Sequence, residues 1–245
     1  MKLDVLAIGA HPDDVELGCG GTVALLARQG RRVGILHLTR GERGTRGTAD
    51  ERRAEAEQAA AALGAVELAF LDAGDGGLRT GLAEEDALIA VLRAFQPDLV
   101  LGPTPSDRHP DHGRAHRLVE DACFYAGLAH RGSGAPHRPA ASFSYMQHDS
   151  FEPSFVVDVT ADWETKLRAL AAYRTQLFQP GVPAGGAGGA GGPVTKVSTE
   201  DFWRMTEGRA RHFGALVGAS FGEPFWYRLP LAVSDPLLLL PGGVR

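Results

Sequence analysis

The stretch "LDVLAIGAHPDDVELGCGG" (residues 3–21) joins an apolar run to a polar turn and then to a cluster of glycines. Residues 3–9 form a continuous apolar run of strand length, as in a parallel sheet whose two faces are both covered by helices. A polar turn directly after such a strand lies at the carboxyl edge of the sheet, where α/β proteins bind their ligands. This stretch therefore predicts an α/β fold with polar chemistry at that edge.

The alternation of strand and helix patterns continues through the first half of the chain. Further strands are predicted over 31–39, 65–71 and 98–104, and helices over 22–30, 49–64, 83–96 and 112–128. Short links between these segments require right-handed crossovers. The predicted fold class is α/β, a Rossmann-like and mostly parallel sheet with helices on both faces.

The regular alternation of strand and helix patterns ends after about residue 130, which predicts a smaller C-terminal α+β portion. It would contain strands at 141–147 and 153–159 and helices at 161–176 and 198–218. We interpret 1–245 as a single domain with a core at 1–130 and a C-terminal lobe at 131–245. The glycine-rich residues 181–193 are predicted to form a mobile surface loop, because so many glycines make one fixed conformation costly.

The composition excludes several classes of protein. The chain has 245 residues, a net charge of -5 and no separate basic block, which argues against a nucleic-acid partner. No apolar run reaches the roughly 18 residues that a membrane span needs. The two cysteines, Cys19 and Cys123, lie far apart in apolar or glycine-rich surroundings and are expected to stay reduced. These properties predict a soluble cytoplasmic protein.

The tripeptide His-Pro-Asp occurs twice, at 11–13 and at 109–111, each time just after a predicted strand. If these strands lie close together, two loops carry three histidines and four aspartates into one cleft: His11, Asp13, Asp14, Asp107, His109, Asp111 and His112. Such a cluster is costly to desolvate unless a divalent metal pairs its charges. Imidazole and carboxylate ligands suit Zn²⁺, and Fe²⁺ can occupy the same kind of site.

The spacing within each copy allows a catalytic metal site. His11 and Asp14 are three residues apart, and so are His109 and His112. Three protein ligands leave one position open, and a neighbouring carboxylate that is not a ligand could serve as general base. Spacing alone does not choose between His109 and His112 as the third ligand. A dinucleotide site is disfavoured, because no G-x-G-x-x-G follows the first strand.

Two motifs, "AHPDDVELGCGG" (10–21) and "PSDRHPDHG" (105–113), resemble the PIG-L/LmbE-like superfamily of zinc-dependent sugar N-deacetylases. Three other segments are similar to its bacillithiol branch: "LTRGERGTRGTADERRAEA" (38–56), "FGALVGASFGEPFW" (213–226) and "PLAVSDP" (230–236). The resemblance implies zinc-dependent removal of the N-acetyl group from N-acetyl-α-D-glucosaminyl L-malate in bacillithiol biosynthesis. The alternatives are a deacetylase for another N-acetylglucosamine derivative, such as a chitobiose-like compound, a mycothiol precursor or a thiol conjugate, and a metal-binding protein without catalysis.

The resemblance also implies roles for individual residues. The metal ligands would be His11, Asp14 and His112. Asp13 would be the general base, and His109, oriented by Asp111, would stabilise the oxyanion and protonate the leaving amine.

Substrate binding and assembly are implied as well. Arg52 and Arg108 would bind the substrate, and Arg43, in the basic run after the second predicted strand, is a further candidate, because arginine matches the carboxylates of an anionic substrate. Phe202 aligns with a tyrosine that some relatives use near the oxyanion, and it cannot donate a hydrogen bond. A homo-oligomer, either a trimer or a hexamer, is expected by resemblance.

Overall fold

The structure, a computed structural model, describes residues 1–179 and 193–239, so all of the predicted glycine-rich loop except Pro193 lies outside the described residues. The strands are β1 Val5–Gly9, β2 Val33–His37, β3 Glu67–Phe70, β4 Leu99–Gly102, β5 Ala141–Tyr145, β6 Phe155–Asp158 and β7 Gly222–Trp226. The main helices are α1 Asp14–Arg28, α2 Ala49–Leu63, α3 Leu82–Phe95, α4 Pro110–Ala126, α5 Trp163–Ala172 and α6 Glu200–Leu216. Within these residues, no helix is long and apolar enough to cross a membrane.

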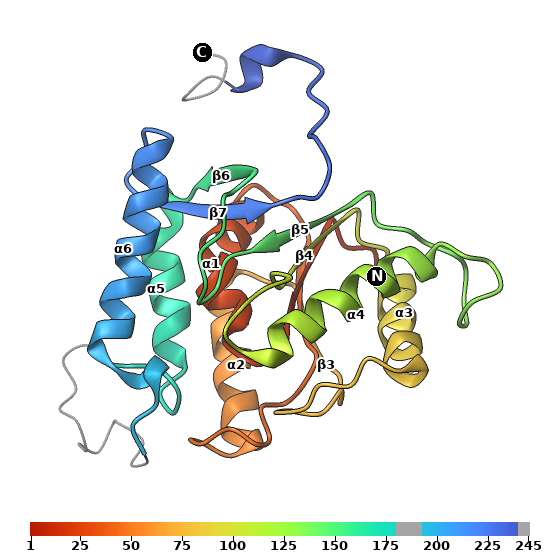
Figure 1. Cartoon of the computed structure of the whole chain (residues 1–245), viewed down its shortest axis with the longest axis horizontal. Coiled ribbons are helices and arrows are strands. Elements are labelled where there is room, and N and C mark those ends of the chain that lie inside the picture. The colour runs from red at the N-terminus through yellow and green to blue at the C-terminus, as the bar shows by residue number, and fades with distance from the viewer. Residues whose placement is uncertain (180–192, 240–245) are drawn as a thin grey trace.

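The strands form one seven-stranded sheet in the order β3-β2-β1-β4-β5-β7-β6. The first five strands in this order are parallel, and β7 runs antiparallel to both of its neighbours. One core layer joins the sheet to α1, α2, α5 and α6, and a second joins it to α3 and α4 (Figure 1). The predicted α/β class with helices on both faces is therefore confirmed.

The C-terminal third, which the sequence interpretation described as a C-terminal lobe of the single domain, continues this sheet. Strand β5 pairs with β4 of the first half, and β7 then pairs with both β5 and β6. Strand β7, with the sequence GEPFW, was not predicted. Its glycine and proline are typical of turns, and tertiary pairing overrides this local preference.

Strand β1 lies beside β4 in parallel register, with Val5 opposite Leu99. The turns that follow these two strands therefore leave the same edge of the sheet. The two His-Pro-Asp segments, which lie about a hundred residues apart in the sequence, meet there because of this strand order.

Helix α1 begins eight residues earlier than predicted, at Asp14 instead of residue 22. Its glycines, which suggested a lead-in loop, lie inside the helix because side chains from elsewhere pack directly on them. A Cβ atom on Gly18 would lie 2.1 Å from the Tyr145 ring, and one on Gly21 would lie 2.8 Å from Val159. Between these glycines the backbone leaves helical geometry at Cys19, with φ of -143°, so α1 is kinked.

A buried ion pair satisfies the backbone groups around this kink. The Glu223 carboxylate accepts hydrogen bonds from the N–H groups of Gly21 at 2.9 Å and Thr22 at 2.7 Å. Lys166 donates from Nζ to Glu223 at 2.6 Å and to the carbonyl of Leu17 at 2.9 Å. The side chains of both partners are only 2% exposed. The pair thereby fastens α1 to α5 and β7.

Glu223→Gln is expected to lower the free energy of unfolding by about 3–5 kcal/mol, because it leaves the buried Lys166 ammonium without a counter-charge. Glu200→Gln is the matched control, since Glu200 pairs with Arg204 on the exposed face of α6. The control is expected to cost less than about 1 kcal/mol. Urea unfolding of both variants measures the difference, and equal losses would contradict a structural role for the buried pair.

Candidate active site

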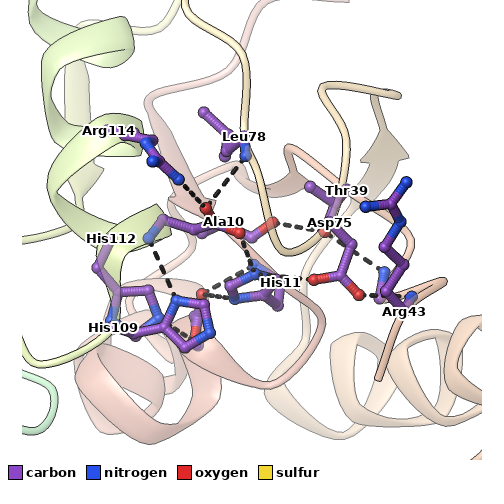
Figure 2. A network of polar contacts seen from close by, with 12 residues as sticks. Ala10, His11, Thr39, Arg43, Asp75, Leu78, His109, His112 and Arg114 are labelled. Atoms are coloured by element: carbon purple, nitrogen blue, oxygen red, sulfur yellow. Dashed lines mark hydrogen bonds and ion pairs between the residues drawn. The ribbon is translucent and has the colours of Figure 1, made fainter. Parts of the chain in front are cut away.

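The turns after β1 and β4 bring three imidazoles together at the carboxyl edge of the sheet. Figure 2 shows His109 and His112 side by side at the start of α4, with His11 from the other turn facing them. The ring centroid of His11 lies 4.8 Å from that of His109 and 5.6 Å from that of His112. The histidines of both sequence motifs therefore share one site.

Asp14 lies between two of these imidazoles. Its Oδ2 atom is 3.4 Å from His11 Nδ1, and its Oδ1 atom is 3.3 Å from His112 Nε2. The carboxylate is held in place by hydrogen bonds from the His11 backbone N–H at 2.8 Å and from Gln147 Nε2 at 2.6 Å. Asp14 thus contacts one ring nitrogen of His11 and one of His112, each through a different carboxylate oxygen.

In both His11 and His112, the ring nitrogen that does not face Asp14 contacts another carboxylate. His112 Nδ1 lies 2.9 Å from Asp107 Oδ1, while His11 Nε2 lies 3.3 Å from oxygens of both Asp75 and Asp111. Histidines that bind metals usually donate their second ring N–H to a carboxylate in this way. The arrangement therefore fits a divalent metal held by the inward-facing nitrogens.

The charge of the cluster supports the same conclusion. Although burial alone would lower the pKa of His112, the carboxylates of Asp14 and Asp107 raise it to about 9. Burial would also lower the pKa of His11, but its carboxylate neighbours raise it well above its usual value. The carboxylates thus favour positive charge on both rings, and a divalent ion could replace those protons.

Metal-capable side chains form three overlapping groups among the described residues, each with ligand atoms within 4.8 Å of one another. The groups are His11 with His109 and His112, Asp107 with His112 and His148, and His11 with Asp75 and Asp111. Asp14 adjoins the first group through its contacts with His11 and His112. These two histidines and Asp14 are the set predicted from the family resemblance.

The sequence interpretation expected the Asp111 carboxylate to orient His109. In the structure, the backbone of α4 holds His109 instead. As the N-cap residue, His109 accepts the Asp111 backbone N–H at Nδ1, at 3.2 Å. The Asp111 carboxylate instead accepts hydrogen bonds from Leu78 N and Arg114 Nη1, both at 3.0 Å, and contacts His11. Helix geometry separates the two parts of Asp111, because the free N–H points out of the helix end while the side chain leaves sideways.

The protonation state of His109 follows from this contact. Burial lowers its pKa, and the positive charges of His11 and His112 lower it further. Since Nδ1 accepts a hydrogen bond, the ring proton of the neutral imidazole is on Nε2. His109 can therefore donate a hydrogen bond from Nε2 without carrying a charge.

Asp13 has an unusual backbone conformation and an unusual pKa. Its φ of 103° lies in the left-handed region, which costs a non-glycine residue about 1–3 kcal/mol and is found mainly at functional sites. Burial raises the pKa of its carboxyl to about 7, against the lowering effect of Arg52, whose Nη2 is 3.6 Å away. A carboxyl group with a pKa near 7 is suited to general base chemistry.

The three predicted arginines have different positions. Arg52 is buried, with its guanidinium on the carbonyls of Pro12 at 2.6 Å and Gly41 at 3.3 Å, so it supports the turn that holds Asp13. Arg108 is exposed at the mouth of the cleft, with no ion-pair partner among the described residues. The exposed Arg43 does not line the cleft, and its backbone N–H donates to Asp75 (Figure 2).

Three residues near the site were not singled out by the sequence interpretation: Asp75, Gln147 and His148. Asp75 follows β3, and Gln147 and His148 follow β5, so the rule that ligands lie beyond the carboxyl ends of strands could have found them. His148 stacks on His112 with ring centroids 5.6 Å apart, and burial lowers its pKa to about 4. Phe202 packs 5.6 Å from the His148 ring, so no hydroxyl lies at that position.

The imidazoles and Asp13 open into a cleft of about 250 Å³. Arg108 and Lys196 line it with exposed cationic side chains, and among the described residues neither has an ion-pair partner. A mostly parallel sheet that carries two carboxylate-supported imidazoles and the buried Asp13 carboxyl group at its ligand-binding edge has the side chains that a metal-dependent hydrolase requires.

The chain belongs to the PIG-L family, described as GlcNAc-PI de-N-acetylase, whose sequence profile matches residues 6–123. It is 33% identical to the diacetylchitobiose deacetylase of Thermococcus kodakarensis, over 89% of this chain and 80% of that protein. It is 30% identical to the 1D-myo-inositol 2-acetamido-2-deoxy-alpha-D-glucopyranoside deacetylase of Actinosynnema mirum, over 87% of this chain and 97% of that protein. The prediction that the chain is an N-deacetylase is confirmed, and deacetylases of this family depend on a metal.

Two other relatives extend the comparison. The crystal structure of a conserved protein from Thermus thermophilus superposes with a TM-score of 0.84 at 35% identity, covering 95% of this chain and 98% of that one. The 4-oxalmesaconate hydratase of Pseudomonas putida is 32% identical, over 67% of this chain and 70% of that protein. The relatives thus support the superfamily and do not single out the bacillithiol branch.

Proposed function

We propose that the chain hydrolyses the N-acetyl group of N-acetyl-α-D-glucosaminyl L-malate in bacillithiol biosynthesis, with Zn²⁺ held by His11, Asp14 and His112. The inference that the substrate is anionic rests on one observation: two exposed cationic side chains, Arg108 and Lys196, lie beside the imidazole cluster. Carboxylates of a malyl group would supply the partners that these cations lack within the described residues. The wider proposal, deacetylation of some N-acetylglucosamine derivative, rests on the relatives and on the cluster itself.

The donor set suits a metal-assisted hydrolysis. A divalent ion held there would polarise the acetamide carbonyl and lower the pKa of the attacking water. Asp13, buried and close to that position, takes a proton from the water as its oxygen forms a bond with the carbonyl carbon. The Nε2–H of His109 donates a hydrogen bond to the carbonyl oxygen as that atom becomes negative.

The proton that Asp13 takes from the water is also used in the second half of the reaction. Asp13 returns it to the nitrogen as the C–N bond breaks, which yields the free amine and acetic acid, and the acid then loses its remaining proton to solvent to become acetate. The neutral state of His109 is the reason for this assignment, because an imidazole with one proton is a poor acid but a good hydrogen-bond donor. His109 therefore stabilises charge, and Asp13 moves the proton in both halves of the reaction.

An amine-release assay tests the proposed substrate. N-acetyl-α-D-glucosaminyl L-malate is compared with N,N'-diacetylchitobiose and with plain N-acetylglucosamine, each with and without a chelator. The highest kcat/KM is expected for the malate conjugate, and the chelator is expected to remove all activity. Faster turnover of diacetylchitobiose would favour the uncharged substrate class, and no amine release from the malate conjugate would overturn the proposed substrate.

Arg108→Ala is expected to raise KM for the malate conjugate by about tenfold or more, since a hydrogen bond between charged groups contributes about 1.5–3 kcal/mol. The KM for diacetylchitobiose should change little, because that substrate carries no carboxylate. Arg117→Ala is the control, because Arg117 is an exposed arginine of α4 that pairs with Asp121 and does not line the cleft. An equal rise in KM for both substrates would show that Arg108 does not recognise the anion.

A further inference from the structure

The chain after β7 forms an arm, defined here as residues 228–237, which bends at 228–229 and at 234 and enters a short 3₁₀ helix, Pro236–Leu239. All of its residues are exposed, and Figure 1 shows it rising away from the body of the molecule. Its large apolar side chains Leu229, Leu231 and Val233 are 49%, 41% and 40% exposed. They alternate along the chain, so in an extended segment they share one face. An alternating apolar face that its own chain leaves open is suited to packing against another surface.

A second unpartnered apolar surface lies along α6. It is a groove of about 630 Å³ between α6 and the loop that follows β5, and the residues used here are Phe151, Pro153, Met205, Arg209, Phe213 and Leu216. Met205 and Leu216 are 39% and 64% exposed at its rim. No arm residue lines this groove within the described chain.

The arm and the groove are complementary in charge. Arg209 donates a 3.3 Å hydrogen bond to the Leu17 carbonyl, and no carboxylate among the described residues lies within ion-pair distance of it. Between Leu229 and Leu237 of the arm, the one charged residue is Asp235, which is exposed and accepts a hydrogen bond from the Leu237 backbone N–H. An apolar segment followed by a carboxylate therefore matches an apolar groove that contains a guanidinium.

The two surfaces lie on different parts of the molecule. The base of the arm packs near α4, where Arg228 lies 3.9 Å from Glu120, whereas the groove runs along α6 on the other side of the sheet. We propose that the arm of one copy of this chain lies in the α6 groove of a second copy. A contact between unlike surfaces can repeat head to tail, and it closes into a ring where the rotation between neighbouring copies allows it. This assigns an interface to the homo-oligomer that the family resemblance suggested, and it does not depend on the proposed substrate.

Light scattering after size exclusion, applied to the full chain and two double variants, tests the proposal. The full chain is expected to form a closed oligomer. Leu231→Asp with Val233→Asp disables the arm, and Met205→Asp with Leu216→Asp disables the groove, so each variant alone should have the mass of one chain. Val66→Asp with Leu82→Asp is the matched control, because both residues are exposed and lie outside the arm and groove, and it should keep the full mass.

Mixing the two disabled variants gives the decisive measurement. The arm variant retains an intact groove and the groove variant an intact arm, so an equal mixture should form a species of two chains and nothing larger. A full chain that is monomeric, a double variant that keeps the full mass, or a mixture that stays monomeric would overturn the proposal. If circular dichroism shows that the arm variant is unfolded, a chain ending at Arg228 replaces it in the same test.

Discussion

Replacing Asp13 with asparagine is expected to lower kcat by about 10²- to 10⁴-fold while the metal stays bound. The asparagine amide cannot accept the proton of the attacking water, and Asp13 is not among the three proposed ligands. Asparagine is chosen because it tolerates the left-handed backbone at this position better than other side chains do. Amine release and the metal content of the purified protein measure the two effects separately.

Backbone strain is the alternative explanation for a loss of activity at this position. Asp13→Gly removes the carboxylate and the strain together, because glycine adopts positive φ without cost. We expect this variant to be as inactive as Asp13→Asn, with its metal retained. Near-normal activity in either variant would rule out Asp13 as the base, and loss of metal from both would place Asp13 among the ligands.

His112→Ala is expected to remove the metal and to lower kcat/KM by about 10³-fold or more, since the metal supplies several kcal/mol of transition-state stabilisation. Asp107→Asn removes the carboxylate that lies 2.9 Å from Nδ1 of the same imidazole, and its amide oxygen can still accept one of the backbone N–H groups of His109 and His148 that Asp107 binds. Its metal affinity should fall by about 10- to 100-fold, as for other indirect partners of metal ligands. Competition with a calibrated chelator measures both affinities.

His116→Ala controls for the loss of an imidazole from α4. His116 lies one turn after His112, but its Nδ1 contacts the Pro103 carbonyl at 3.1 Å and its side chain does not line the cleft. This variant should keep its metal. Full metal content in His112→Ala would mean that another group, such as the His11, Asp75 and Asp111 cluster, holds the ion.

Much of the fold follows from local pattern, because buried parallel strands and amphipathic helices differ in the length and period of their apolar residues. The predicted start of α1 was wrong because Gly18 and Gly21 are selected by contacts with Tyr145 and Val159, which only the folded chain brings near. The sheet position of β7 was missed for the same reason, since pairing with β5 and β6 outweighs its glycine and proline.

The site was predictable to the extent that its residues follow strands β1 and β4. The repeat of His-Pro-Asp located the cluster before the strand order was known. The function of the Asp111 carboxylate was not predictable, because sequence proximity to His109 suggested a pair while the folded helix directs that carboxylate to His11 and Leu78. Asp75 remained unassigned because its contact with His11 depends on where the loop after β3 turns.

The ion pair at the α1 kink has a consequence for the order in which the molecule can be completed during synthesis. Asp13 and Asp14 leave the ribosome early, but the N–H groups of Gly21 and Thr22 receive their carboxylate only when Glu223 emerges, about 200 residues later. At 5–20 residues per second this delay is roughly 10–40 s. The carboxylate that binds the backbone of the helix beginning at Asp14 therefore becomes available only when β7, the last of the seven strands along the chain, is synthesised. A nascent chain that already carries both His-Pro-Asp motifs consequently has all the proposed ligands but not yet the anchored helix that positions one of them.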